Sequence, residues 1–175
     1  MLLGISGALR RDSTNTRLLR EAARLYGGPF ELADIRFPLY DGDAEAAEGV
    51  PASVQAVADK IGAASAVVVA TPEYNQSLSG VLKNALDWIS RVDGNPWRGK
   101  PVAILSAAAG RTGGARASYA LRLAMTPFRP RLVTGPDVMI AGARGEFGED
   151  GQLTSERYLK TLTELMEVLR TEAAR

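Results

Sequence analysis

The 175-residue chain contains no cysteine and no histidine. The first absence excludes disulfides, thiolate nucleophiles and iron–sulfur clusters. The second removes the most common general base and the most common zinc ligand. If the chain is a catalyst, its chemistry must therefore depend on carboxylates, Lys, Arg, Ser or Tyr side chains, or on a bound cofactor.

The chain also lacks an excess of charge and a long apolar run. Its 21 basic and 20 acidic residues leave a net charge of +1, which argues against binding to nucleic acid or to an acidic partner. No apolar run is long enough to cross a bilayer. The N-terminal stretch Met1 to Ser6 lacks the long apolar core of a signal peptide. We therefore expect a cytoplasmic protein that binds neither nucleic acid nor membrane.

Short apolar runs typical of buried strands alternate with helical patterns along the chain. The expected strands are Met1–Ile5, Phe30–Ile35, Ala66–Ala70, Val102–Ser106 and Arg131–Val133, with Val138–Ile140 as a candidate extension of the last. Between and after them, apolar residues recur at helical spacing, as in the helix from about Ser13 to Tyr26. The segment Phe37 to Gly49 is predicted to be a loop, because it contains proline, glycine and several acids. No repeat or linker is evident, so residues 1–175 are expected to form a single domain.

This alternation predicts an α/β protein with helices on both faces of a five-stranded parallel sheet. The length suits the doubly wound, flavodoxin-like strand order 2-1-3-4-5, in which the first, third and fourth strands are neighbours. The loops that follow those strands are the polar, glycine-bearing stretches of residues 6–16, 70–80 and 106–114. We therefore expect these loops to meet in one crevice at the carboxyl edge of the sheet.

The first loop carries several hydroxyls, the amide of Asn15 and the paired Arg10 and Arg11, and it leads into a helix. Free N–H groups and the positive end of a helix dipole favour a phosphate there. Helix capping alone could explain Ser13, but it does not explain the two arginines. Neither a dinucleotide fingerprint nor a P-loop motif occurs, so a monophosphate fits better than a pyrophosphate or a triphosphate.

The second loop contains Pro72, Glu73, Tyr74 and Asn75, a combination that suits a planar heterocycle with polar edges. The alternative is an ordinary loop with a buried tyrosine. The third loop contains Gly110, Gly113 and Gly114, which would let the backbone approach a ligand closely. The alternative for this loop is a simple turn.

Three motifs in these loops resemble those of the NAD(P)H-dependent FMN reductases, a family that includes bacterial quinone and chromate reductases. The most specific motif runs from Thr71 to Trp88 and reads TPEYNQSLSGVLKNALDW. The stretch Gly7-Ala8-Leu9-Arg10, followed by Ser13 and Asn15, resembles the family's phosphate loop. The stretch from Ser106 to Gly114 resembles its third flavin loop.

The resemblance implies a flavodoxin-like fold, bound FMN and roles for the matching residues. Residues at the phosphate end would be Ser6, Arg10, Ser13, Asn15 and Thr16, and those along the flavin ring would be Pro72, Glu73, Tyr74, Asn75, Ser106, Gly110 and Gly113. Two positions depart from the family pattern. Ala8 stands where serine is usual, which could weaken FMN binding, and Ser79 stands where proline is frequent, which is expected to loosen the start of the following helix.

The function implied is hydride transfer from NAD(P)H to FMN and then to a quinone or a similar acceptor, with no catalytic acid or base assigned. One alternative is a flavodoxin-type electron carrier or a flavin-binding module without NAD(P)H turnover. A phosphoacceptor receiver domain shares the strand order, but it needs acids where this chain has Ser6 and Thr71. The family commonly forms homodimers or homotetramers. Trp88 and Trp97 near the flavin-side helix fit such an interface, unless both pack in the core.

Overall fold

The computed structural model describes all 175 residues and contains a single, entirely parallel sheet in the order β2-β1-β3-β4-β5, with β6 also paired to β4. The strands are β1 (Leu2–Ser6), β2 (Phe30–Ala33), β3 (Ala66–Thr71), β4 (Pro101–Ala107), β5 (Arg131–Leu132) and β6 (Val138–Ile140). The predicted flavodoxin-like order is confirmed. The expected fifth strand consists of two pieces, because β5 pairs with the start of β4 and β6 pairs with its end.

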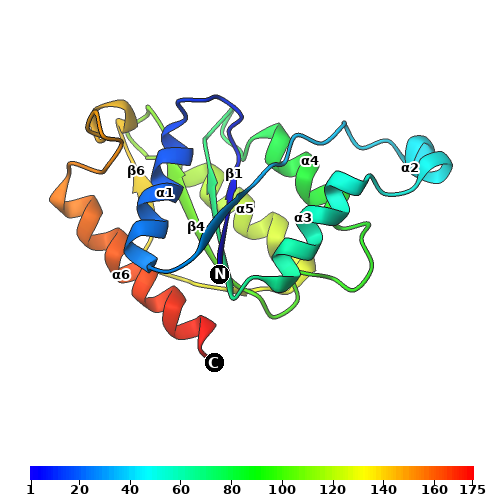
Figure 1. Cartoon of the computed structure of the whole chain (residues 1–175). Helices are drawn as coiled ribbons and strands as arrows, with labels where there is room; N and C mark the ends of the chain where they lie inside the picture. The colour runs from blue at the N-terminus through cyan, green and yellow to red at the C-terminus, as the bar shows by residue number, and fades with distance from the viewer.

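Helices cover both faces of the sheet, as expected. They are α1 (Thr14–Tyr26), α2 (Gly42–Glu48), α3 (Ala52–Ala63), α4 (Gly80–Ile89), α5 (Ala115–Met125) and α6 (Glu156–Ala173), with 3₁₀ turns η1 (Thr126–Phe128) and η2 (Ala143–Gly145). In Figure 1, α1 and α6 lie on one side of the sheet and α3, α4 and α5 on the other. None of the helices is both long and apolar enough to cross a membrane.

The central strands contribute side chains to both layers in turn. On β3, Ala66 and Val68 belong to the apolar cluster under α1 and α6, whereas Val67 and Val69 belong to the cluster under α3, α4 and α5. A strand buried on both faces needs apolar residues at every position. This requirement explains why the strand-like runs in the sequence show no alternation of polar residues.

The prediction that the whole of Phe37–Gly49 is a loop was wrong, because residues 42–48 form the helix α2. This helix projects from the body of the molecule (Figure 1) and has no buried residue. Asp41 caps it by accepting a hydrogen bond from the N–H of Asp43, and Glu45 pairs with Arg91 of the body at 2.9 Å. Polar contacts hold this helix in place, so it needs no apolar face. Its sequence therefore lacks the apolar periodicity by which the other helices were predicted.

Both tryptophans pack in the core and are almost completely buried. The indole N–H of Trp88 donates to the carbonyl of Pro38 at 2.8 Å, and the ring of Tyr40 meets the indole edge-on at 5.0 Å between centroids. The alternative of core packing is thus confirmed for Trp88 and Trp97. They give no support to an interface between subunits.

Candidate functional site

Three buried hydroxyl side chains mark the carboxyl ends of the neighbouring strands β1, β3 and β4. In the sheet register, Ser6 lies opposite Ala70, and Thr71 lies opposite Ser106. Each hydroxyl makes a hydrogen bond within the loop that follows its strand. Ser6 Oγ lies 2.8 Å from Thr16 Oγ1. Thr71 Oγ1 donates to the carbonyl of Pro72 at 2.9 Å, and Ser106 Oγ donates to the carbonyl of Gly113 at 2.7 Å. The three loops therefore begin next to one another, and a hydrogen bond from a strand hydroxyl fixes the conformation of each loop.

The first loop ends in the N-terminus of α1, where Ser13 is the cap. Its Oγ accepts hydrogen bonds from the N–H groups of Asn15 at 3.2 Å and Thr16 at 3.4 Å. The N–H of Thr14 makes no hydrogen bond within the protein. Arg10 extends from the loop and donates to the carbonyl of Asp12 at 2.9 Å. Capping by Ser13 thus leaves a free donor and a cation for an anionic ligand.

Asn15 connects the first loop to the third. Its Nδ2 donates to the carbonyl of Ala107 at 2.9 Å, and its Oδ1 accepts from the N–H of the same residue at 3.0 Å. The side chain is 2% exposed. Because its oxygen and one of its amide hydrogens are used in this way, Asn15 fixes the position of α1 relative to β4.

The second loop contains a tight two-residue turn. The N–H and carbonyl of Tyr74 exchange hydrogen bonds with Ser77, both at 3.1 Å, and the intervening Asn75 and Gln76 both have left-handed backbone, with φ of 49° and 66°. This pattern is that of a type I′ turn. Tyr74 is 58% exposed, so the alternative of a buried tyrosine is excluded.

Glu73 connects the second loop to the helix that follows the third. Its Oε2 accepts from the N–H groups of Arg116 at 3.0 Å and Ala117 at 3.4 Å, in the first turn of α5. The cap residue of α5 is Gly114, which has no side chain to make these bonds. Glu73 therefore takes over a capping role from a distant part of the sequence.

The expectation that Ser79 loosens the start of α4 was wrong. Its Oγ accepts from the N–H of Leu82 at 3.4 Å and donates to the carbonyl of Gly7 in the first loop at 2.6 Å. Ser79 is 1% exposed. It therefore caps α4 and also joins the second loop to the first.

The glycines of the third loop differ in their surroundings. Gly113 has a φ of +62°, and a Cβ added to it would overlap the backbone of Met139 in β6. Gly114 has a φ of +90°, while Gly110 faces open space. Close packing against β6 therefore explains the glycine at position 113 without any ligand.

A cavity of about 260 Å³ lies where the three loops meet. Among the predicted site residues, the cavity is lined by Arg10, Ser13, Asn15, Pro72, Glu73 and Tyr74. The other predicted residues lie outside its walls: Ser6, Thr16, Asn75, Ser106, Gly110 and Gly113. Sequence reasoning had assigned no site role to five further wall residues: Ala107, Ala108, Ala109, Ala143 and Arg144.

Arg144 is the most informative residue that sequence reasoning missed. It lies in η2, beyond β6, and η2 is held against the third loop by a hydrogen bond from Ala143 N–H to the carbonyl of Ala108 at 3.1 Å. The exposed guanidinium of Arg144 makes no ion pair. Arg144 lies 30 residues beyond Gly114, the end of the third loop, so no local motif pointed to it.

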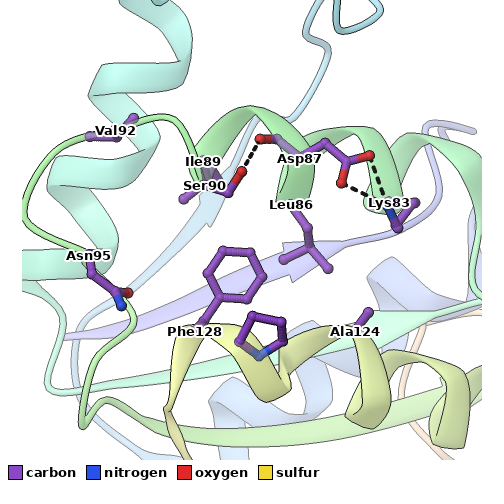
Figure 2. Close-up of a pocket in the computed structure, with 10 residues that line it drawn as sticks. Lys83, Leu86, Asp87, Ile89, Ser90, Val92, Asn95, Ala124 and Phe128 are labelled. Carbon is purple, nitrogen blue, oxygen red and sulfur yellow. Dashed lines mark hydrogen bonds and ion pairs between the residues drawn. The ribbon is translucent and has the colours of Figure 1, made fainter.

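A second, larger cavity of about 540 Å³ lies away from the three loops (Figure 2). It lies between α4 and the end of α5, where Leu86, Ala124 and Phe128 approach one another and Lys83 pairs with Asp87 at 2.7 Å. None of the predicted site residues lines it. The smaller cavity at the loops is therefore the candidate site.

The sequence and fold match known flavin enzymes. Residues 1–145 match the family model described as NADPH-dependent FMN reductase. The chain is 44% identical over 171 residues to an NAD(P)H-dependent FMN reductase of Pseudomonas aeruginosa, covering 96% of this chain and 92% of that protein. It is 41% identical over 139 residues to the quinone reductase of Escherichia coli, covering 76% and 73%.

Among solved structures, the chain resembles the flavoenzyme FerB, an NAD(P)H:(acceptor) oxidoreductase of Paracoccus denitrificans. The TM-score is 0.88 at 32% identity, with 99% of this chain and 96% of that one covered. The order of strands, the position of the cavity and these similarities agree with one another. The chain belongs to the NADPH-dependent FMN reductase family.

Proposed function

We propose that the chain is an FMN-containing reductase that takes electrons from NAD(P)H and passes them to a quinone or a similar acceptor. The observation that carries this proposal is the cavity at the meeting point of the three loops. One part of its wall is the N-terminus of α1 with Arg10, and another is formed by Pro72 to Tyr74 and Ala107 to Ala109. This combination suits a ligand with a phosphate and a flat polar ring.

The residues present fit FMN. The free N–H of Thr14 and the guanidinium of Arg10 are donors suited to a phosphate, and the positive end of the α1 dipole adds to their attraction. Ala8 offers no hydroxyl, so the phosphate would depend more strongly on these groups. The exposed ring of Tyr74 and the backbone of Ala107–Ala109 would bound the isoalloxazine.

The protein's part in the reaction is placement. FMN, when bound, supplies the hydride transfer from a nicotinamide to an acceptor. The only carboxylate in the cavity wall, that of Glu73, is bonded to the first turn of α5. Without histidine or cysteine in the chain, no residue of the site is assigned as a proton donor or acceptor. Arg144 adds a second cation to the wall and would favour negative charge on the ligand.

Quinone reductases at 41% identity support a quinone as the acceptor. A flavodoxin-type carrier would bind FMN without oxidising NAD(P)H, so turnover separates the two functions. The FMN-loaded protein is expected to oxidise NAD(P)H steadily when benzoquinone is added. Flavin binding without steady oxidation would favour the carrier. The cytoplasmic location is a prediction that cell fractionation can test.

We further propose that the chain forms a homo-oligomer through α5. Tyr119 and Leu123 on this helix are 58% and 75% exposed, and they lie close in sequence to the apolar Ala124 and Phe128 at the larger cavity. One aromatic and one aliphatic side chain, both large and exposed on the same helix, support a contact between α5 and a second copy of the chain. Light scattering is expected to give a multiple of 18.6 kDa, and a pure monomer would contradict this proposal.

A further inference from the structure

The turn η2, which carries Arg144 to the candidate site, is fixed at several points. The N–H of Ala143 donates to the carbonyl of Ala108 in the third loop at 3.1 Å, and Ala143 is buried. The N–H of Ala141 donates to the hydroxyl of Tyr158 in α6 at 3.1 Å. The backbone of Arg144 is therefore held against the third loop, on the part of the cavity wall that is assigned to the flavin ring.

The guanidinium of Arg144 has no negative partner in the protein. It is exposed and makes no ion pair, although the acids Glu146 and Glu149 follow it closely in the sequence. The only carboxylate in the cavity wall, that of Glu73, accepts from the first turn of α5 and lies 3.5 Å from the guanidinium of Arg116. Arg144 therefore adds a positive charge to the cavity that no acid of the wall cancels.

The proposed reaction places a negative charge on the flavin ring. A hydride carries two electrons and one proton, so a neutral ring that accepts it gains one negative charge unless a second proton follows. Apart from Glu73, the polar side chains of the wall are hydroxyls, an amide and guanidinium groups, none of which is a strong acid at neutral pH. A cation near the ring can stabilise the charge in place of a proton. Arg144 is suited to this role, because the other cation of the wall, Arg10, belongs to the first loop at the phosphate end.

We propose that Arg144 stabilises the negative charge of the reduced flavin ring and so raises the reduction potential of bound FMN. This inference rests on the proposed reductase function. A higher potential favours the uptake of electrons from a nicotinamide and leaves less driving force for their transfer to the acceptor. Arg144 therefore biases the site toward acceptors of relatively high potential, such as benzoquinones.

The affinities of the protein for oxidised and for reduced FMN test this proposal without turnover. Their ratio fixes the difference in reduction potential between bound and free FMN, and that potential is measured by anaerobic equilibration of the FMN-loaded protein with a reference dye. Arg144→Gln is expected to weaken the binding of reduced FMN about tenfold, which lowers the potential by about 30 mV. The affinity for oxidised FMN should stay within about twofold, because the oxidised ring carries no charge for the arginine to stabilise. Arg144→Lys keeps the positive charge and should restore most of the potential.

Two further variants separate this role from others. Arg98→Gln makes the same change in net charge at an exposed residue that has no ion pair and lies outside the cavity, so the potential should not change. Arg10→Gln removes the cation assigned to the phosphate, so it should weaken the binding of oxidised and reduced FMN equally and also leave the potential unchanged. The effect of Arg144→Gln should shrink between about 0.1 and about 1 M salt, because the Debye length falls from about 10 to about 3 Å.

The possible outcomes distinguish the inference from the proposed function. A flavin-loaded Arg144→Gln variant with an unchanged potential would overturn the inference alone. Equal losses of affinity for oxidised and reduced FMN would also overturn it, because Arg144 would then bind the phosphate, as Arg10 is expected to do. An unchanged protein that takes up no flavin would contradict the proposed function and, with it, this inference.

Discussion

Asn15 and Ala107 are joined by two hydrogen bonds, although 92 residues separate them in the sequence. The amide of Asn15 donates to and accepts from the backbone of Ala107, at 2.9 and 3.0 Å, in a buried position. The first turn of α1 is thereby fixed to the end of β4. The relative position of the first and third loops, and so the shape of the cavity, depends on this pair.

Replacing Asn15 with Ala is expected to lower the free energy of unfolding by about 2–4 kcal/mol, because a buried N–H and a buried carbonyl lose their partners. Asn84→Ala is a matched control, since Asn84 makes the same pair of bonds at the surface, with Tyr40 N–H and the carbonyl of Pro38, both at 2.9 Å. Water can replace those bonds, so a loss below about 1 kcal/mol is expected. Equal losses in urea unfolding would contradict the role of burial.

Glu73→Ala is expected to destabilise the protein by about 1 kcal/mol, because the first turn of α5 loses its cap. Glu73→Gln keeps an oxygen that can accept from Arg116 N–H and should retain most of that stability. Thermal unfolding of the two variants provides the comparison. If Gln were as damaging as Ala, the negative charge rather than the hydrogen bonds would be the stabilising feature.

Ser79→Ala is expected to cost about 1–2 kcal/mol, since the cap of α4 and the bond to Gly7 are both lost. Ser79→Pro suits the backbone φ of −67° but lacks the hydroxyl, so a similar loss is expected. Ser90→Ala removes a surface hydroxyl at the other end of the helix and serves as the control. A proline variant as stable as the unchanged protein in urea unfolding would refute the role given to Ser79.

The attachment of α2 should depend on pH. The pKa of Glu45 lies below its ordinary value of 4.5, because Arg91 and then Tyr40 donate hydrogen bonds to the carboxylate. A lowered pKa in the folded state means that the stabilisation is complete above pH 4.5 and is lost as the pH falls through the folded value.

The difference in Tm between the unchanged protein and Glu45→Gln should therefore be positive at neutral pH and vanish in acid. Glu48, on the same helix, makes no ion pair, so Glu48→Gln is the matched control and should leave the Tm at neutral pH nearly unchanged. A Glu45 effect that persisted unchanged in acid would show that the carboxylate charge is not what stabilises α2.

The fold was largely predictable from the sequence, because buried parallel strands leave a direct trace in it. The strand that contains Val67–Val69 is buried on both faces and therefore needs apolar residues at every position. The order of strands follows from their alternation with helices. Residues 42–48 were not predictable as a helix in the same way. Their stability comes from Asp41 and from the pairing of Glu45 with Arg91, which lies 46 residues away.

The position of the candidate site in the fold was predictable from the sequence, but the contacts of its individual side chains were predictable only in part. The loops converge as expected because strands β1, β3 and β4 are neighbours. The use of individual side chains depends on contacts between distant segments, such as Glu73 with α5 and Ser79 with Gly7, which no local spacing encodes. Arg144 likewise lies in the cavity wall because of a contact between distant segments, namely the packing of η2 against the third loop.

The central claim is that the cavity between the three loops holds FMN. The most direct test is the absorbance spectrum of the protein, recorded after FMN has been added and the excess removed. The unchanged protein is expected to show flavin bands with about one FMN per chain, and Arg10→Ala to lose most of that flavin because a cation at the phosphate is removed. A colourless protein, or an Arg10→Ala variant with normal flavin content, would contradict the account.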